Sequence, residues 1–351
     1  MSDVNKVSCC SSNSLKEDQK LLVAIIGSGS AAFACAIKAA EGGARVTIIE
    51  GTDVIGGCCV NVGCVPSKIL IRAAQLAHQQ RTNPFDGLKN THPQLSRSLL
   101  AHQQTARVEE LRGAKYESIL NKNPALSLLK GYARFKDKNT LLVKKNDGSE
   151  DELHANRILI ATGSAPTVPL IDGLSDTPYW TSTEALFAEE LPMSLIVIGS
   201  SVVALEIAQA YARLGSQVTV LARHTLLYAE DPLLGEKLTE CFEKEGIRVL
   251  DNTQASYISH DGRTFSLSTN NGVLKADKLL VSEKNASLTN MSLKSKYSKA
   301  RLSKMVLKEH DYIDLKIPKS SLRNIDFGFD ENRFFFTSQF GLIENLNLNV
   351  Y

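Results

Sequence analysis

Short, almost wholly apolar runs recur along the first 281 residues, and glycine-containing turns follow most of them. Such runs are typical of strands buried on both faces of a parallel sheet. In two places the order is strand, turn, helical stretch, second strand, which predicts two βαβ units and an α/β fold. The segments are Leu21–Ile26, Phe33–Ala40 and Arg45–Ile49 in the first unit, Leu195–Ile198, Leu205–Leu214 and Gln217–Leu221 in the second, and a later strand, Leu279–Val281.

The turn of the first unit, residues 27–32, has the pattern G-x-G-x-x-A of a dinucleotide-binding fingerprint. Gly27 would make the tight turn, Gly29 would admit a pyrophosphate, and Ala32 would let helix and strand pack closely. Glu50 ends the second strand, where a carboxylate can bind a ribose hydroxyl. The alternative is a glycine turn without a ligand. The flanking elements favour a Rossmann-like domain.

The turn of the second unit begins at Gly199 and has Ser201 in the place of the second glycine, with Val203 two residues later. The strand that follows ends at Arg223 and not at an acid. An acid there would bind a 2′-hydroxyl, whereas an arginine accommodates a 2′-phosphate. The second unit is therefore predicted to bind NADPH in preference to NADH.

Between the two units lies a cysteine motif, residues 56–68, with the sequence GGCCVNVGCVPSK. Cys59 and Cys64 are separated by four residues at the predicted start of a helix, and Lys68 follows one turn after Cys64. A helix start stabilises a thiolate through its dipole and its unpaired N–H groups. Cysteines can also be small buried hydrophobic residues, and Lys68 alone is equally compatible with a surface lysine. The spacing favours a disulfide that opens and closes.

Composition narrows the class of protein. The chain has 351 residues, a net charge of +2 and 22% charged residues, which does not suggest nucleic-acid or membrane binding. The seven cysteines and the polar start of the chain argue against a secreted, disulfide-stapled scaffold and against a signal peptide or membrane span. We expect a cytoplasmic protein. Cys9 and Cys10 are either ordinary thiols of the tail or a site for a soft metal ion.

The cysteine motif resembles the active site of the flavin-dependent pyridine nucleotide–disulfide oxidoreductases. Two further segments, Tyr179–Leu186 and Ile198–Glu206, resemble the mercuric reductases within that family. The resemblance extends from about Leu21 to Val281. It implies FAD and NADPH as cofactors and Hg(II) as the substrate.

The resemblance also implies roles for single residues. Cys64 becomes the thiolate that touches the flavin, Cys59 is the exchanging thiol, and the pair holds Hg(II). Lys68 pairs with Glu206 beside the flavin; without the resemblance, Glu206 would be interpreted as a solvated helix carboxylate. Flavin contacts are further expected from Gly27, Gly29, Ala31, Ala32, Glu50, Gly57, Cys58, Ala133, Thr162 and Gly163. Ala133 would lie against the adenine, although the Ala161–Gly163 segment also fits a plain glycine turn. Cys58 occupies the position of a threonine in the family, and a thiol is a weaker hydrogen-bond partner.

The predicted organisation is a disordered tail (1–20), an FAD domain (21–170), an NADPH domain (171–281) and a tail of unknown fold (282–351). Helices are expected over residues 75–129, with a loop near Asn83, and a hairpin turn at Asp147–Gly148. The resemblance stops after Val281, so we expect the C-terminal dimerisation domain of the homodimeric family to be missing. Two alternatives to Hg(II) reduction stay open. One is a truncated, non-catalytic protein that binds nucleotide or metal, and the other is a disulfide reductase of the dihydrolipoamide dehydrogenase type.

Overall fold

The computed structural model describes residues 20–166 and 168–282 in full. Beyond them it describes only the backbone of the strands at 285–294, 313–323, 326–330, 333–337, 340–344 and 347–350. The predicted disordered tail up to residue 19, with Cys9 and Cys10, lies outside the described residues. The chain forms two compact units, Met1–Asn61 with Val108–Gly163 and Val62–Arg107 with Ser164–Tyr351. The domain boundaries expected from the sequence stay a prediction.

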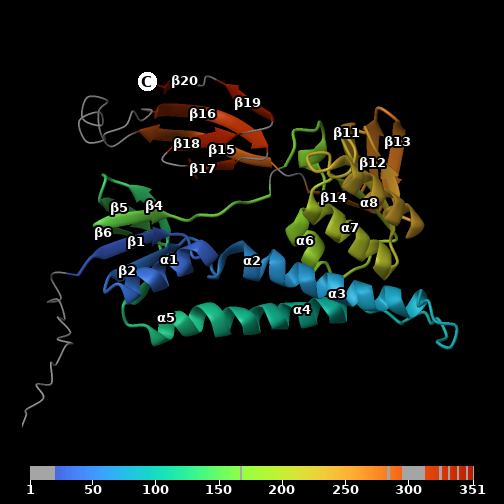
Figure 1. Cartoon of the computed structure of the whole chain (residues 1–351), viewed down its shortest axis with the longest axis horizontal. Coiled ribbons are helices and arrows are strands. Elements are labelled where there is room, and N and C mark those ends of the chain that lie inside the picture. The colour runs from blue at the N-terminus through green and yellow to red at the C-terminus, as the bar shows by residue number, and fades with distance from the viewer. Residues whose placement is uncertain are drawn as a thin grey trace, which may run out of the picture. The chain divides into compact units, whose positions relative to one another are not determined.

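The first unit contains a parallel sheet in the order β3-β2-β1-β7, of which β1 and β2 are labelled in Figure 1. Its elements are β1 (Leu22–Ile26), α1 (Ser30–Glu41), β2 (Arg45–Glu50), β3 (Leu126–Lys130) and β7 (Arg157–Ile160). The apolar run of β1 is buried because both neighbouring strands pair with it and α1 covers the sheet. The first predicted βαβ unit is therefore confirmed, with the turn at residues 27–29 following the carboxyl end of β1.

A small antiparallel sheet of β4 (Tyr132–Phe135), β5 (Thr140–Lys144) and β6 (Glu150–His154) completes the first unit. The predicted hairpin turn at Asp147–Gly148 joins β5 to β6. Gly148 has a positive φ of 87°, which favours glycine. The sequence expectation of helix up to residue 129 is wrong at its end, because residues 126–130 pair with β2 as β3.

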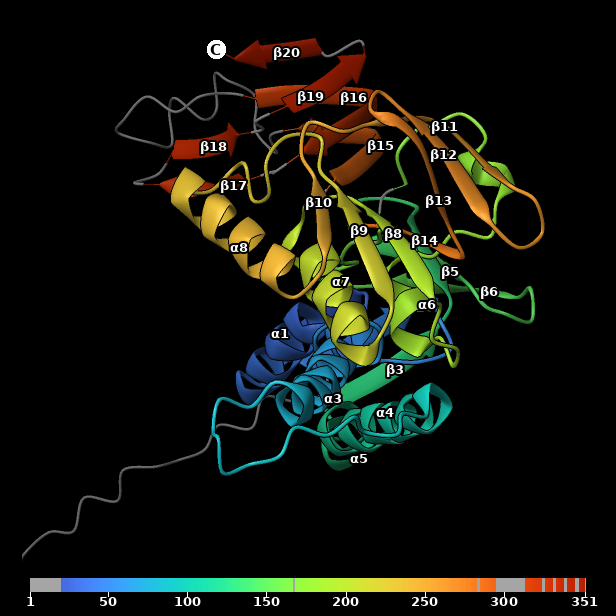
Figure 2. The same ribbon diagram turned by 90° about the vertical axis from the view of Figure 1, so that its right-hand side faces the viewer.

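The second unit contains another parallel sheet, in the order β10-β9-β8-β14 (Figure 2). Its elements are β8 (Ser194–Ile198), α7 (Val202–Leu214), β9 (Gln217–Leu221), α8 (Pro232–Lys244), β10 (Arg248–Leu250) and β14 (Lys278–Val281). An antiparallel sheet of β11 (Ala255–His260), β12 (Phe265–Thr269) and β13 (Gly272–Ala276) precedes β14, and η3 (Leu174–Asp176) and α6 (Ser182–Phe187) precede β8. With two parallel sheets, the predicted α/β class with two Rossmann-like units is confirmed.

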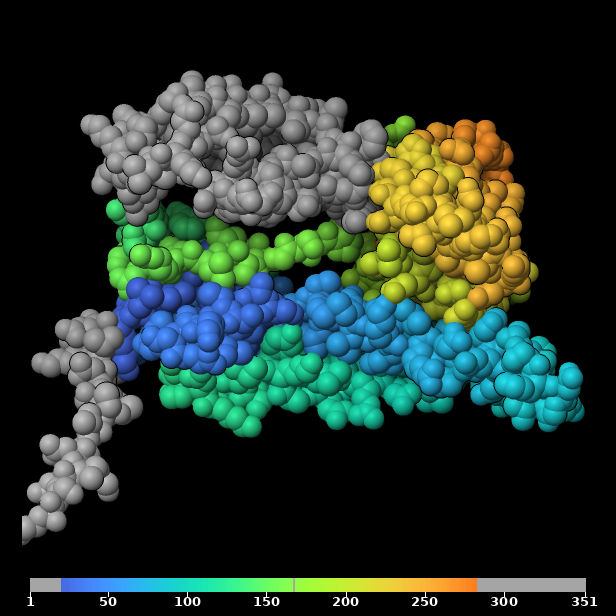
Figure 3. All heavy atoms as spheres, viewed as in Figure 1, coloured from blue at the N-terminus to red at the C-terminus, as the bar shows by residue number. Residues whose placement is uncertain are grey.

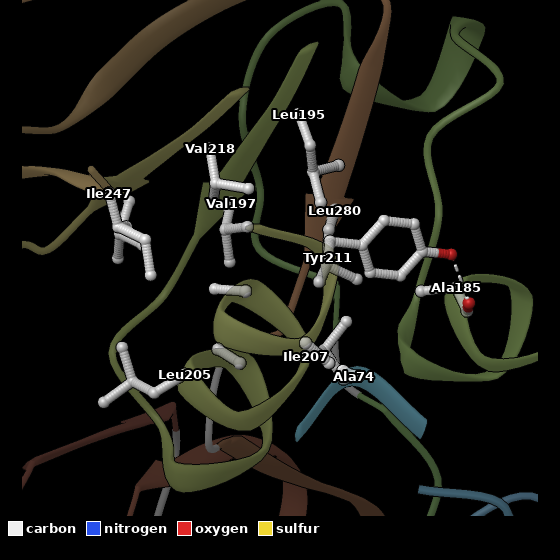
Figure 4. Packing of buried hydrophobic residues seen from close by; sticks show 14 of the residues in the cluster. Ala74, Ala185, Leu195, Val197, Leu205, Ile207, Tyr211, Val218, Ile247 and Leu280 are labelled. Atoms are coloured by element: carbon white, nitrogen blue, oxygen red, sulfur yellow. Dashed lines mark hydrogen bonds between the residues drawn. The ribbon is translucent and has the colours of Figure 1, made fainter. Parts of the chain in front are cut away.

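The remaining helices are α2 (Gly57–Asn61), α3 (Cys64–Arg81), α4 (Arg97–Arg112), η2 (Gly113–Glu117) and α5 (Ser118–Lys122). Within the second unit, α3 packs on α7, and small side chains such as Ala74 allow the close approach (Figure 4). Tyr211 of α7 is fully buried and donates a hydrogen bond of 2.6 Å to the carbonyl of Ala185. The loop that joins α3 to α4, cyan in Figure 3, exposes Phe85 at its surface.

Past residue 282 the described backbone forms strands. β16 (Ile313–Arg323) pairs antiparallel with β15 (Asn285–Lys294), β19 (Phe340–Glu344) and β20 (Asn347–Val350), while β17 (Asp326–Asp330) pairs with β18 (Arg333–Thr337).

Candidate active site

The turn after β1 in the first unit requires glycine at its first position. Gly27 has a φ of 105°, and a Cβ added there would lie 2.2 Å from the carbonyl oxygen of Ala161. The same Cβ would lie 3.2 Å from the Cα of Thr162, so the predicted Ala161–Gly163 turn packs directly on the fingerprint. Gly29 then caps α1 with extended backbone and no side-chain hydrogen bond. The first N–H groups of α1 are left to an anion such as a diphosphate.

The cysteine motif approaches the same turn through its own glycines. Gly57 has a φ of 67°, and a Cβ there would lie 2.6 Å from the Cα of Gly29. The N–H of Gly56 donates to the carbonyl of Ser28 over 3.0 Å, which ties the two loops together. The structure thus brings together Gly27, Gly29, Gly57 and Thr162. The result is a surface made of backbone, in which a Cβ at Gly27 or at Gly57 would collide with the backbone that faces it.

Glu50, at the end of β2, is held as a carboxylate. Partial burial would raise its pKa, but hydrogen bonds from Ser28 and Thr52 and the nearby charge of Lys130 hold the pKa below its usual value. The Ser28 hydroxyl donates to Glu50 over 2.5 Å, and the backbone N–H of Thr52 donates over 2.8 Å. An ionised, oriented carboxylate at this position is suited to accept hydrogen bonds from ribose hydroxyls. The supporting role of Ser28 was not predicted, although it stands inside the fingerprint.

The other expected flavin contacts are less constrained. Ala31 is exposed on the first turn of α1, whereas Ala32 is fully buried and packs against the sheet. Ala133 lies in β4 opposite Val143, and Thr162 and Gly163 are exposed after β7. Their contact with a flavin nucleotide stays a prediction.

The cysteine motif folds as two helical segments. Cys58 and Cys59 lie in the short α2, the first exposed and the second half-buried. Cys64 is exposed and is the first residue of the 18-residue α3, whose N-cap, Gly63, makes no side-chain hydrogen bond. Pro66 has no N–H and the N–H of Ser67 donates to the carbonyl of Gly63, so the N–H groups of Cys64 and Val65 are those that α3 offers to a thiolate.

Lys68 and Glu206 form the ion pair that the resemblance implied. The Nζ atom of Lys68, one turn after Cys64, donates to a carboxylate oxygen of Glu206 on α7. The side chains are 59% and 34% exposed, so the pair is accessible to a ligand. It joins the helix that begins at Cys64 to the helix that follows the second nucleotide turn.

A second polar contact joins the same two helices seven residues further along each. Arg213 of α7 donates to Gln75 of α3 and forms a bidentate pair with Glu245, with N–O distances of 2.6 and 2.7 Å. Burial would raise the pKa of Glu245, but the hydrogen bonds and charge of Arg213 hold it below its usual value. The equal spacing means that α3 and α7 run parallel, with their amino ends at the same end of the pair. Sequence reasoning missed this contact.

The second nucleotide turn differs from the first. Gly199 has a φ of 122°, which favours glycine, and Ser201 is the N-cap of α7. The Ser201 hydroxyl accepts a hydrogen bond from the N–H of Ala204 and donates to the carbonyl of Ser282. Val203 is 46% exposed at the helix start, and Arg223 is half-buried two residues after β9. The backbone fits a nucleotide turn, with a hydroxyl where the first unit has only a glycine.

Within 20–166 and 168–282 no three His, Cys, Asp or Glu side chains gather as a metal site would require. No helix in the described part of the chain is long and apolar enough to cross a membrane.

Comparison with known families gives one match, to the model described as "Pyridine nucleotide-disulphide oxidoreductase", over residues 22–283. Among curated proteins, the chain is 73% identical over 277 residues to a mercuric reductase of Shewanella putrefaciens, covering 78% of this chain and 50% of that protein. It is 57% identical over 270 residues to a mercuric reductase of Acidithiobacillus ferrooxidans, covering 77% of this chain and 49% of the relative. The chain thus spans about half the length of these curated relatives.

Among solved structures, the chain is similar to the HOCl-induced flavoprotein disulfide reductase of Escherichia coli in its Cu(II) complex. The TM-score is 0.66 and the sequence identity 29%, over 75% of this chain and 56% of that one. The match supports the fold of the two nucleotide units.

Proposed function

The chain belongs to the pyridine nucleotide–disulphide oxidoreductase family, and on that premise we propose that it reduces Hg(II) with electrons from NADPH, by way of FAD and the Cys59–Cys64 disulfide. The observation that carries the proposal is the Lys68–Glu206 ion pair. It joins the helix that begins at one redox cysteine to the helix that follows the predicted NADPH turn. Lys68 stands one turn after Cys64 and pairs with a residue 138 positions later, which is the pairing that the resemblance implies.

FAD fits the first unit. The loops at Gly27 and Gly57 meet neighbouring backbone so closely that neither position has room for a Cβ, which leaves a surface without side chains there. The N–H groups at the start of α1 suit a diphosphate, and the Glu50 carboxylate suits a ribose. When bound, FAD would accept a hydride and pass the two electrons on to the disulfide.

NADPH is assigned to the second unit. Gly199 permits the turn, the start of α7 would offer N–H groups to a diphosphate, and Arg223 would supply a cation for a 2′-phosphate. Ser201 already caps one N–H of α7, so a bound diphosphate would have to share or displace that hydroxyl. The electron balance closes, because oxidation of one NADPH to NADP⁺ and a proton releases the two electrons that take Hg(II) to Hg(0).

The protein side chains would bind the metal ion and set the charge around it. Thiolates bind soft ions tightly, so Cys59 and Cys64 are the ligands proposed for Hg(II) as substrate. Cys64 is exposed at the start of α3, where a metal ion can reach its sulfur. Glu206 fixes the position of the Lys68 ammonium one turn along the same helix, which places a positive charge near the site of electron transfer. The availability of NADPH favours the cytoplasm as the place of the reaction.

Purified protein, reconstituted with FAD, tests the proposal. We expect bound flavin, and NADPH oxidation that depends on added HgCl₂ and produces Hg(0) vapour. Cys64→Ser should abolish it, whereas Cys241→Ser, an exposed cysteine on α8, should leave it unchanged. Lack of flavin binding, or oxidation driven by lipoamide and not by HgCl₂, would contradict the proposal. The second result would favour a reductase of the dihydrolipoamide dehydrogenase type.

A further inference from the structure

Asn61, between the two redox cysteines in sequence, is buried and has its whole amide engaged. Its Nδ2 donates to the carbonyls of Ile55, over 2.9 Å, and of Gly57, over 3.0 Å. Its Oδ1 accepts from Nη1 of Arg112 over 3.1 Å. Only 9% of Asn61 is exposed, so removal of the side chain would take away a donor from both carbonyls and an acceptor from Arg112 in a buried place.

The two carbonyls belong to the loop that approaches the fingerprint. Gly57 is the glycine that leaves no room for a Cβ against Gly29, and it is also the first residue of α2. The amide of Asn61 therefore holds the turn before α2 and the end of α2 at one fixed distance. Cys59 lies between these two points, so its position follows from theirs.

Arg112 decides which way the Asn61 amide faces. A buried amide that turned over would present its oxygen to the two carbonyls, which are acceptors, and its nitrogen to a guanidinium, which is a donor. The guanidinium is itself held by an ion pair with Glu117 at 3.6 Å, and its side chain is only 17% exposed. The contact spans 51 residues of sequence.

We propose that Arg112 is a positioning residue of the redox centre, which acts through Asn61 to fix α2 and thereby Cys59. The inference rests on the proposed function in one respect, namely that Cys59 is one of the two redox thiols. It assigns to Arg112 no contact with substrate or cofactor. Its consequence is chemical and not only structural, because the stability of a disulfide depends on how often one thiol lies within reach of the other.

The equilibrium to measure is the exchange of the protein disulfide with two glutathione thiols, which gives the protein dithiol and oxidised glutathione. It needs no flavin. Wild type, Arg112→Met, Arg112→Lys and Arg134→Met would be equilibrated in glutathione buffers, trapped by acid and alkylation, and mapped by tandem mass spectrometry that separates Cys58 from Cys59. Arg134 is the matched control, since it forms an exposed pair with Glu150 at 2.9 Å in the same unit.

Arg112→Met should weaken the Cys59–Cys64 disulfide about tenfold, a rise of roughly 30 mV in potential. Arg112→Lys keeps one charged donor and should recover most of the loss, and Arg134→Met should match wild type. A lower melting temperature for Arg112→Met with an unchanged potential would overturn the positioning role. If that variant does not fold, an unchanged potential in Glu117→Gln, which removes the charge that holds the Arg112 guanidinium, would overturn it equally. Absence of a Cys59–Cys64 disulfide in wild type would instead refute the proposed function, and this role with it.

Discussion

Replacing Gly57 with alanine probes the contact between the cysteine motif and the fingerprint most directly. The Cβ would stand 2.6 Å from the Cα of Gly29, and a backbone atom cannot move aside as a side chain can. Either α2 or the start of α1 must shift. Both movements disturb the surface on which a diphosphate would lie.

A second alanine substitution separates this contact from the cost of the backbone conformation. Gly43, in the same unit, has a φ of 86° against 67° for Gly57, and nothing lies within 4 Å of its added Cβ. An L-residue in this left-handed region costs about 1–2 kcal/mol. Gly43→Ala should therefore destabilise the protein by about that amount and leave FAD binding unchanged.

Gly57→Ala carries the same conformational cost and the clash in addition. If the clash removes about 2–3 kcal/mol of diphosphate binding, the dissociation constant for FAD rises by roughly 30- to 150-fold. Flavin fluorescence titration of the apoprotein gives this constant, and thermal unfolding of the apoprotein gives the conformational cost. Equal FAD affinity in Gly57→Ala and Gly43→Ala would refute the argument that Gly57 and Gly29 form the cofactor surface.

Three further predictions follow from single contacts. Glu50 has a pKa held below its usual value, so its ionised form stabilises the fold above the unfolded pKa of about 4.3, and this stability is lost as the pH falls through the folded pKa. Glu50→Gln should therefore flatten the acid side of the stability profile measured by urea unfolding. An unaltered profile would show that the Glu50 carboxylate adds no stability. Tyr211→Phe leaves the carbonyl of Ala185 without its 2.6 Å donor and should lower the free energy of unfolding by about 1–2 kcal/mol; an equally stable variant would show that the bond adds nothing. Cys58→Thr supplies a stronger hydrogen-bonding group and should tighten FAD binding about 3- to 10-fold, and weaker binding would contradict a contact with the flavin nucleotide at this position.

Much of the fold could be predicted because its strands are buried on both faces. Runs such as residues 22–26 and 195–198 have no alternation that a surface strand would show, and the turns after them have the glycines that their φ values require. The sequence wrongly predicts helix for residues 126–129, since Leu-Ser-Leu-Leu contains no β-branched residue. Their strand conformation comes from pairing with β2, which lies 80 residues earlier.

The site was predictable only where its residues are close in sequence. Glu50 and Cys64 could be found from local patterns, whereas the Lys68–Glu206 pair came from the resemblance alone. Arg112 could not be found, because its partner Asn61 precedes it by 51 residues and nothing in the sequence around Arg112 points to the cysteine motif. Buried polar contacts of this length have no local sequence signal, since they depend on how two helices pack.

The most direct test of the central claim is an anaerobic reductive titration of the FAD-loaded protein with dithionite. If Cys59 and Cys64 form a flavin-linked redox disulfide, wild type should take up four electrons per bound FAD, two for the flavin and two for the disulfide. Cys64→Ser should take up only two, and it should lack the long-wavelength band of a thiolate against oxidised flavin. Uptake of two electrons by wild type, or four by Cys64→Ser, would contradict the account.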